Sequence, residues 1–142
     1  MGHIYQELIN LKELHGLKNL CGFFSRRIFM ECTIYLAEGC NLKCTYCYEG
    51  IDKKTGKMDI RTFDQTLAFI MKNRVENDKI HIVFLGGEPL LNKPLFFYAI
   101  NKINSDYKEI RDQFKLEMTT NGVFLDDNVI KVVKEENINL SS

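Results

Sequence analysis

Three cysteines within a short stretch constrain this chain more than any other feature of its sequence. They are Cys40, Cys44 and Cys47, and their spacing is C-x₃-C-x₂-C. Cysteine thiolates hold iron–sulfur clusters, and a [4Fe–4S] cube takes four of them. Three clustered thiolates leave one iron without a protein ligand, and a free coordination position is what a catalytic metal site needs. The spacing therefore predicts a cluster with one open iron.

Two other interpretations of these cysteines stay open at this point. A zinc site needs a fourth ligand, and no histidine lies nearby, although Cys32 or a partner chain could supply one. Cys44 and Cys47 alone match the spacing of a thioredoxin-type redox pair, which leaves Cys40 unexplained. Cys32 lies inside a predicted strand and Cys21 is most simply a small buried hydrophobe, so neither is expected to be a ligand.

The composition is that of one ordinary globular domain in a reducing compartment. The chain has 142 residues, of which 45% are hydrophobic and 27% charged, so it can bury a core. Its formal net charge is zero, which gives no reason to expect a nucleic-acid partner. Five cysteines, three of them clustered, favour metal binding over a secreted disulfide framework. The sequence shows no signal-peptide pattern and no apolar run long enough for a membrane span, so we expect a cytoplasmic protein without a membrane partner.

Predicted helices and strands alternate along the chain. Hydrophobic periodicity, caps and turn residues predict an amphipathic helix over 4–20, strands over 31–37, 80–85, 114–119 and from 138, and helices over 59–76, 92–105 and after Asp126. The strand 80–85 is apolar except for His81, as expected of a strand covered on both faces. His81 within it is expected to be a satisfied core histidine rather than a catalyst. Such alternation predicts a parallel sheet, here over residues 31–142 after a helical segment over 1–30.

Two further motifs follow predicted strands, as the cysteines do. Gly86-Gly87-Glu88-Pro89 follows the strand 80–85, and Thr119-Thr120-Asn121-Gly122 ends the strand 114–119. In a βα barrel the functional groups sit at the carboxyl ends of the strands. We therefore expect all three motifs at one rim of the sheet.

The cysteine motif, with Tyr46 before its last cysteine, resembles the C-x₃-C-x-aromatic-C signature of the radical S-adenosylmethionine (SAM) enzymes. In that family the open iron binds the amino and carboxylate groups of SAM, and an electron from the cluster cleaves SAM to methionine and a 5′-deoxyadenosyl radical. The run Gly86–Pro89 resembles the family's GGEP motif. Thr119–Gly122 resembles the end of the third strand in relatives with SPASM or twitch extensions. The combination is most similar to peptide and protein maturases, including the anaerobic sulfatase-maturating enzymes.

The resemblance implies a set of site residues. The ligands of the [4Fe–4S] cluster would be Cys40, Cys44 and Cys47, and the SAM-binding residues would be Gly86, Gly87, Glu88, Pro89, Asn121, Ser141 and Tyr46. Glycines let the main chain approach a ligand closely, and Glu88 can accept a charge-assisted hydrogen bond from an ammonium group. Lys115 and Glu117 are candidates for lining the substrate cavity, with a solvent-facing polar stripe as the alternative.

The implied fold is the N-terminal part of a parallel-stranded partial TIM barrel, with about three βα units and a fourth strand. The implied activity is that of a radical SAM enzyme that acts on a peptide or protein and takes its electron from an external flavodoxin or ferredoxin. A non-catalytic iron–sulfur or zinc-binding module is the alternative. The sequence does not identify the substrate, and it contains no further cysteine cluster that could hold an auxiliary iron–sulfur centre.

Overall fold

The computed structural model describes residues 30–47, 50 and 55–142. The predicted helix over 4–20 and Cys21 lie outside the described residues. The elements follow one another as β1 (Met30–Ala37), α1 (Ile60–Asn73), β2 (Ile80–Gly86), the short 3₁₀ helix η3 (Pro89–Asn92), α2 (Lys93–Asp106), the 3₁₀ helix η4 (Lys108–Gln113), β3 (Phe114–Thr119), α3 (Asp127–Glu135) and β4 (Asn139–Ser141). The strands and helices predicted between residues 31 and 141 are confirmed, and η3 and η4 are additions to them.

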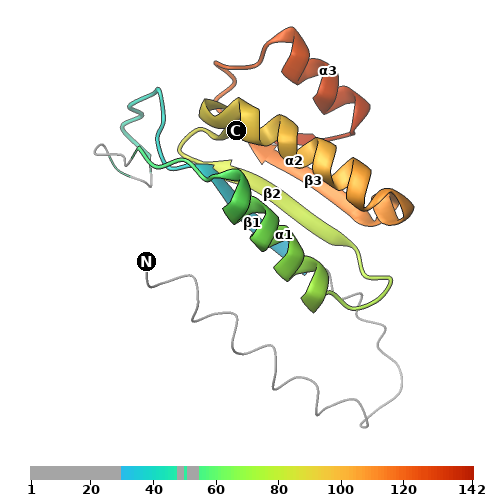
Figure 1. Cartoon of the computed structure of the whole chain (residues 1–142). Coiled ribbons are helices and arrows are strands. Elements are labelled where there is room, and N and C mark those ends of the chain that lie inside the picture. Colours follow the sequence, from blue (N-terminus) through green and yellow to red (C-terminus); the bar gives the residue numbers. More distant parts are fainter. Residues whose placement is uncertain (1–29, 48–49, 51–54) are drawn as a thin grey trace, which may run out of the picture.

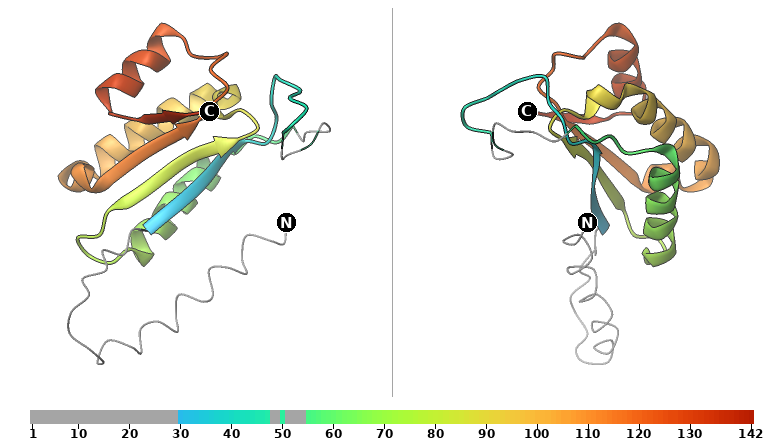
Figure 2. Two further views of the ribbon diagram at one scale, coloured as in Figure 1. Left: turned by 180° about the vertical axis from the view of Figure 1, so that it is seen from behind. Right: turned by 60° about the vertical axis from the view of Figure 1, so that its left-hand side comes forward.

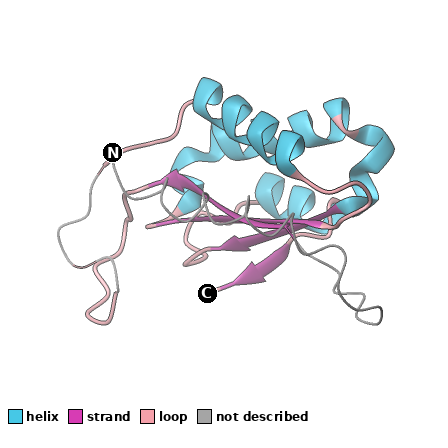
Figure 3. Cartoon of the chain, turned by 90° about the horizontal axis from the view of Figure 1, so that it is seen from below, coloured by secondary structure: helices cyan, strands magenta, loops and turns pink. Residues whose placement is uncertain are grey.

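The four strands form one parallel sheet in the order β1-β2-β3-β4. Helices lie between consecutive strands along the chain, as parallel connections require. Figures 1 and 2 show α1 and α2 lying side by side across the sheet, and Figure 3 shows the helices gathered on one side of the strands. The carboxyl ends of all four strands therefore point to the same rim.

The hydrophobic core lies between the helices and one face of the sheet. Alternate residues of β3 are buried there, and so are those of β2, where Phe84 meets Phe96 of α2 edge to face at a centroid distance of 5.9 Å. The expectation that β2 is covered on both faces is wrong for the described residues, because its other side chains are only half-buried. The physical reason is that the helices of the described chain form a single layer.

Acidic side chains cap two of the helices, as predicted. The Asp59 carboxylate accepts a hydrogen bond from the Thr62 N–H at 2.7 Å, and this bond lowers the pKa of Asp59. Asp126 accepts from the Val129 N–H at 3.0 Å and also pairs with Lys93 at the start of α2. The Lys93 ammonium is the main cause of the lowered pKa of Asp126. Within the described ranges no helix is both long and apolar enough to cross a membrane.

The face of the sheet away from the helices carries a row of polar side chains. The His81 imidazole lies between two carboxylates, with Nδ1 at 3.1 Å from Glu31 Oε2 and Nε2 at 3.2 Å from Glu117 Oε2. His81 thus has partners, as predicted, but it lies on the uncovered face rather than in the core. Lys115 is exposed on the same face.

Candidate cofactor site

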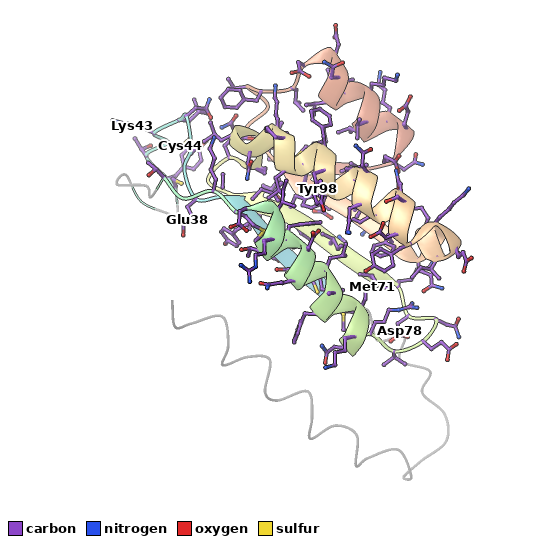
Figure 4. The ribbon with its side chains drawn as sticks, viewed as in Figure 1. Glu38, Lys43, Cys44, Met71, Asp78 and Tyr98 are labelled. Carbon is purple, nitrogen blue, oxygen red and sulfur yellow. The ribbon has the colours of Figure 1, made fainter. Side chains whose placement is uncertain are left out.

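The loop that carries the three cysteines leaves the sheet at the end of β1 and is closed at its base. The Glu38 N–H donates to Gly56 O at 2.8 Å, and the Met58 N–H donates to Leu36 O at 3.1 Å. An antiparallel bridge joins Ala37 to Lys57 between these bonds. Figure 4 shows Lys43 and Cys44 far out on this loop and Glu38 nearer its base, at the opposite end of the sheet from Asp78. The cysteine loop therefore lies at the carboxyl-end rim, as the sequence predicts.

A buried asparagine strengthens the closure of the loop. The Asn92 side chain donates two hydrogen bonds of 2.9 Å, one to Leu36 O before the loop and one to Met58 O after it. Asn92 was predicted as the start of α2, and the structure places it there, although its side chain makes no cap bond to the helix. Its amide holds the two ends of the cysteine loop together instead.

The glycines of the Gly86–Pro89 turn pack against the chain itself. A Cβ added to Gly86 would lie 2.0 Å from Ala37 O, and one added to Gly87 would lie 2.4 Å from Gly39 O. Gly86 also has a φ of +143°, a conformation that side chains disfavour. The Glu88 N–H then donates to Gly39 O at 2.8 Å. The close approach that we expected between these glycines and SAM is seen here between the end of β2 and the start of the cysteine loop.

The Glu88 carboxylate is fully buried and bonded to the chain. It accepts from the Leu90 N–H at 2.9 Å, from the Thr120 hydroxyl at 2.8 and 3.0 Å, and from the Asn121 N–H at 2.8 Å. These bonds connect the turn after β2 to the turn after β3, so the carboxylate fixes the relative position of two strand ends. The prediction that Glu88 contacts the SAM amino group stays a prediction.

The turn after β3 reaches the cysteine loop through Asn121. The side-chain amide of Asn121 lies 3.5 Å from Cys40 Sγ and 2.9 Å from Asn41 Oδ1, with the amide nitrogen as donor in both contacts. The three motifs singled out in the sequence are therefore in direct contact. Asn121 bonds through its backbone to Glu88 of the Gly86–Pro89 turn and through its side chain to the cysteine loop.

The three cysteines of the loop are all free to act as ligands. Cys40, Cys44 and Cys47 are free thiols, each half-buried. In the described part of the chain, no group of three or more histidine, cysteine or acidic side chains lies close enough to hold one metal ion. Cysteine thiolates are the ligands that a [4Fe–4S] cube takes, each bound to a different iron, so the residue types of this loop fit such a cluster.

The remaining predicted site residues lie on the same rim with different surroundings. Tyr46 is 89% exposed on the cysteine loop. Pro89 is buried as the first residue of η3. Ser141, at the end of β4, places its hydroxyl 2.9 Å from that of Thr119. The predictions that these side chains contact SAM stay predictions.

Two residues that shape the site carried no functional assignment from sequence. They are Thr120, whose hydroxyl bonds Glu88, and Asn92, whose amide closes the cysteine loop. The sequence did contain a signal for the local bond of Glu88 to its own turn, because an acidic residue directly before a proline suits the start of a helical turn. Glu88 does begin η3 in this way. The partners across the rim had no local signal, because Thr120 and Asn92 act on residues more than thirty positions away.

Residues 34–141 match the radical SAM superfamily, and the chain belongs to it. Members of this superfamily use a [4Fe–4S] cluster and SAM. The assignment agrees with the site geometry, since the cysteine loop and the Gly86–Pro89 turn meet at the carboxyl-end rim of the sheet.

The fold is similar to solved structures of an anaerobic sulfatase-maturating enzyme. One of them, with bound SAM and the Cp18Cys peptide, is 25% identical with a TM-score of 0.65, covering 78% of this chain and 30% of that chain. Another, with bound SAM and the Kp18Cys peptide, has a TM-score of 0.67 at 24% identity and covers 80% and 31%. These neighbours are partial TIM barrels, so the four-stranded sheet corresponds to the N-terminal part of such a barrel.

Relatives in sequence include proteins of different names. An uncharacterized protein of Methanocaldococcus jannaschii is 30% identical over 99 residues, which cover 70% of this chain and 32% of that protein. A GTP 3′,8-cyclase of Clostridium botulinum is 34% identical over 117 residues, which cover 77% of this chain and 34% of the cyclase. The chain thus spans about a third of the length of these relatives.

Gly87→Ala is expected to destabilise the intact protein by about 1–3 kcal/mol, the usual cost of overpacking. The new Cβ would meet backbone atoms of Gly39, which cannot move without shifting the cysteine loop. Gly56→Ala is the matched control, because its Cβ would meet only the end of the exposed Glu38 side chain, which can turn away. Denaturant unfolding followed by circular dichroism measures both, and equal losses would contradict the packing argument.

Glu88→Gln is expected to lower the free energy of unfolding by about 1–3 kcal/mol, because the new NH₂ group must face one of the donors that now bond to the carboxylate. Thr120→Val, which removes the hydroxyl donor at similar volume, is expected to cost a similar amount. Thr120→Ser keeps that donor and should retain more stability than Thr120→Val in the same denaturation experiment. A serine variant as unstable as the valine variant would show that the hydroxyl contact is not what stabilises the rim.

Proposed function

We propose that this chain forms the cluster- and SAM-binding part of a radical SAM enzyme that modifies a peptide or protein. Cys40, Cys44 and Cys47 each give one thiolate to a single [4Fe–4S] cluster. The observation that carries the proposal is the contact among three motifs at one rim: the turn Gly86–Pro89 bonds to the base of the cysteine loop, and Asn121 bonds to its first cysteine. Superfamily membership and the bound SAM of the structural neighbours support the same function.

A [4Fe–4S] cluster held by Cys40, Cys44 and Cys47 would supply the electron for reductive cleavage of SAM to methionine and a 5′-deoxyadenosyl radical, which would take hydrogen from the substrate. The chain's own residues hold the site in place. Gly86 and Gly87 bring the main chain of the turn against the loop, where it is proposed to meet the methionine end of SAM. Glu88 fixes the turn through its hydrogen bonds. Tyr46 offers an exposed aromatic surface beside the last cysteine, and Ser141 a hydroxyl on the same rim.

The fourth described cysteine does not suit a ligand. Burial raises the pKa of the Cys32 thiol, and the neighbouring Glu31 carboxylate raises it further. The thiolate is the form that binds metal, and a raised pKa means that the Cys32 thiol gives up its proton less readily. This supports a three-cysteine cluster with an open iron over a zinc site that recruits Cys32.

The proposed substrate is a peptide or protein, because the structural neighbours are a maturase that was solved with bound peptides. A nucleotide such as GTP is the second candidate, since a GTP 3′,8-cyclase is 34% identical over most of this chain. Either reaction needs an external electron donor of the flavodoxin or ferredoxin type. A reducing cytoplasm is the proposed location, because free thiols and a reducible cluster require it.

Single alanine variants at Cys40, Cys44 and Cys47 are expected to lose the cluster, because each removes one of three thiolates. After anaerobic reconstitution, the intact wild-type protein should contain about four irons per chain, with a broad absorption band in the visible region. Cys32→Ala is the matched control and should keep its iron. Full iron in Cys44→Ala would refute this ligand set.

The intact protein should release 5′-deoxyadenosine and methionine when it is incubated anaerobically with SAM and dithionite. The release is expected to be slow without substrate and to be lost in Cys44→Ala. Chromatography of the products measures it, and comparison of added peptide pools with GTP separates the two substrate classes by which one accelerates release. A protein with an intact cluster that releases no 5′-deoxyadenosine would instead support a non-catalytic iron–sulfur module.

A further inference from the structure

All polar groups of the Asn121 side chain are engaged with the chain. Its amide nitrogen donates to Cys40 Sγ at 3.5 Å and to Asn41 Oδ1 at 2.9 Å. Its amide oxygen accepts from the Val123 N–H at 3.0 Å, in the turn that follows β3. The direction of the amide is therefore set by its own turn, and its N–H groups face the cysteine loop.

The backbone of Asn121 is fixed as firmly as its side chain. Its N–H donates to the buried Glu88 carboxylate at 2.8 Å, and the Thr120 hydroxyl beside it bonds to the same carboxylate. Glu88 lies in the turn whose main chain packs on Gly39, the residue before Cys40. The turn that contains Glu88 thus contacts both partners of the N–H···S bond: Glu88 bonds to Asn121, and the main chain of the turn packs beside Cys40.

Cys40 Sγ also receives a second N–H group. The Leu42 N–H lies 3.4 Å from this sulfur, within the loop itself. Two N–H donors directed at one sulfur form the environment that stabilises negative charge there. One donor comes from the loop and the other from a strand end 81 positions away in sequence.

We propose that Asn121 is a positioning residue that holds Cys40 and raises the reduction potential of the cluster through its N–H···S hydrogen bond. The inference rests on the proposed function, because it takes Cys40 as a cluster ligand. It gives Asn121 a different role from direct contact with SAM, since both ends of its amide already have partners in the chain.

The direction of the effect follows from charge. Reduction adds one electron to the cluster and so increases the negative charge on its sulfur ligands. A donor directed at a ligand sulfur stabilises the reduced form more than the oxidised form, and hydrogen bonds to sulfur are among the factors that set cluster potentials. Removing the donor should therefore make the cluster harder to reduce.

The test compares Asn121→Ala with Asn41→Ala in the reconstituted intact protein. Asn121→Ala removes both the bond to sulfur and the bond to the loop. Asn41→Ala removes the bond to the loop and leaves the N–H···S bond of Asn121 in place. It also removes the 3.9 Å contact in which the Cys40 thiol donates to Asn41 Oδ1, but a thiolate that binds iron has no proton to donate there. A dithionite titration followed by electron paramagnetic resonance gives the midpoint potential of each. The expected result is a shift to more negative potential in Asn121→Ala and a potential close to wild type in Asn41→Ala.

A second measurement needs no stable Asn121 variant. Wild-type protein with ¹⁵N-labelled asparagine side chains, reduced and studied by pulsed paramagnetic resonance, should show a hyperfine coupling from an asparagine nitrogen near the cluster. The coupling should persist in Asn41→Ala. Its absence in the wild type would overturn the proposed bond, even if Asn121→Ala failed to fold.

The outcomes separate the two proposals. A wild-type protein that binds no cluster, or a Cys40→Ala variant that keeps it, would overturn the ligand set and this inference with it. A cluster-bearing protein whose potential is the same in Asn121→Ala would overturn this inference alone. Equal shifts in Asn121→Ala and Asn41→Ala would also overturn it, because the effect would then come from loop position rather than from the bond to sulfur.

Discussion

The buried carboxylate of Glu88 is the interaction on which the rim of this sheet depends. An ionised carboxylate removed from water costs several kcal/mol unless hydrogen bonds replace its hydration. Here the replacement comes from neutral donors on two segments: Leu90 on its own turn, and Thr120 and Asn121 after β3. The carboxylate needs these donors, and the same bonds keep β3 beside β2. Any movement of β3 away from β2 would leave a buried acceptor without its donors. The carboxylate thereby fixes the distance between two strand ends.

Close packing extends this constraint to β1. The absence of side chains at Gly86 and Gly87 lets the end of β2 lie directly on the backbone of residues 37–39, so the start of the cysteine loop cannot shift independently. Asn92 and the bridge between Ala37 and Lys57 close the same loop at its base. A loop that is held at its base and at Cys40 has its first cysteine fixed, whereas the described bonds of Cys44 and Cys47 lie within the loop itself, with the Cys47 N–H donating to Cys44 O at 3.2 Å.

The elements were predictable because their signals are local, and the contacts of the site were not. Alternation over residues 114–119 identifies β3, and Asp59 and Asp126 mark helix starts, since each pattern involves neighbours within a turn or two. The sequence also indicated that the three motifs would share a rim, because parallel strands align their carboxyl ends. It did not indicate where the Glu88 carboxylate points. That depends on Thr120 and Asn121, whose closeness is a product of the whole sheet. The arrangement of the described helices in a single layer also depends on the whole sheet, and for this reason β2 is only half-covered among the described residues, against expectation.

The polar row on the opposite face of the sheet is better understood as structural than as a second site. Glu31 and His81 are each the second residue of their strands, at the end away from the cysteine loop, and in parallel βα folds functional groups gather at the other end. The imidazole has a carboxylate at each nitrogen, and a neutral ring can donate to only one of them. Each protonation state therefore leaves the ring bonded to at least one neighbouring strand. His81 thus bonds β2 to at least one neighbouring strand across a face that the described helices do not cover. The three sequence motifs lie at the other end of the sheet, where the strands have their carboxyl ends.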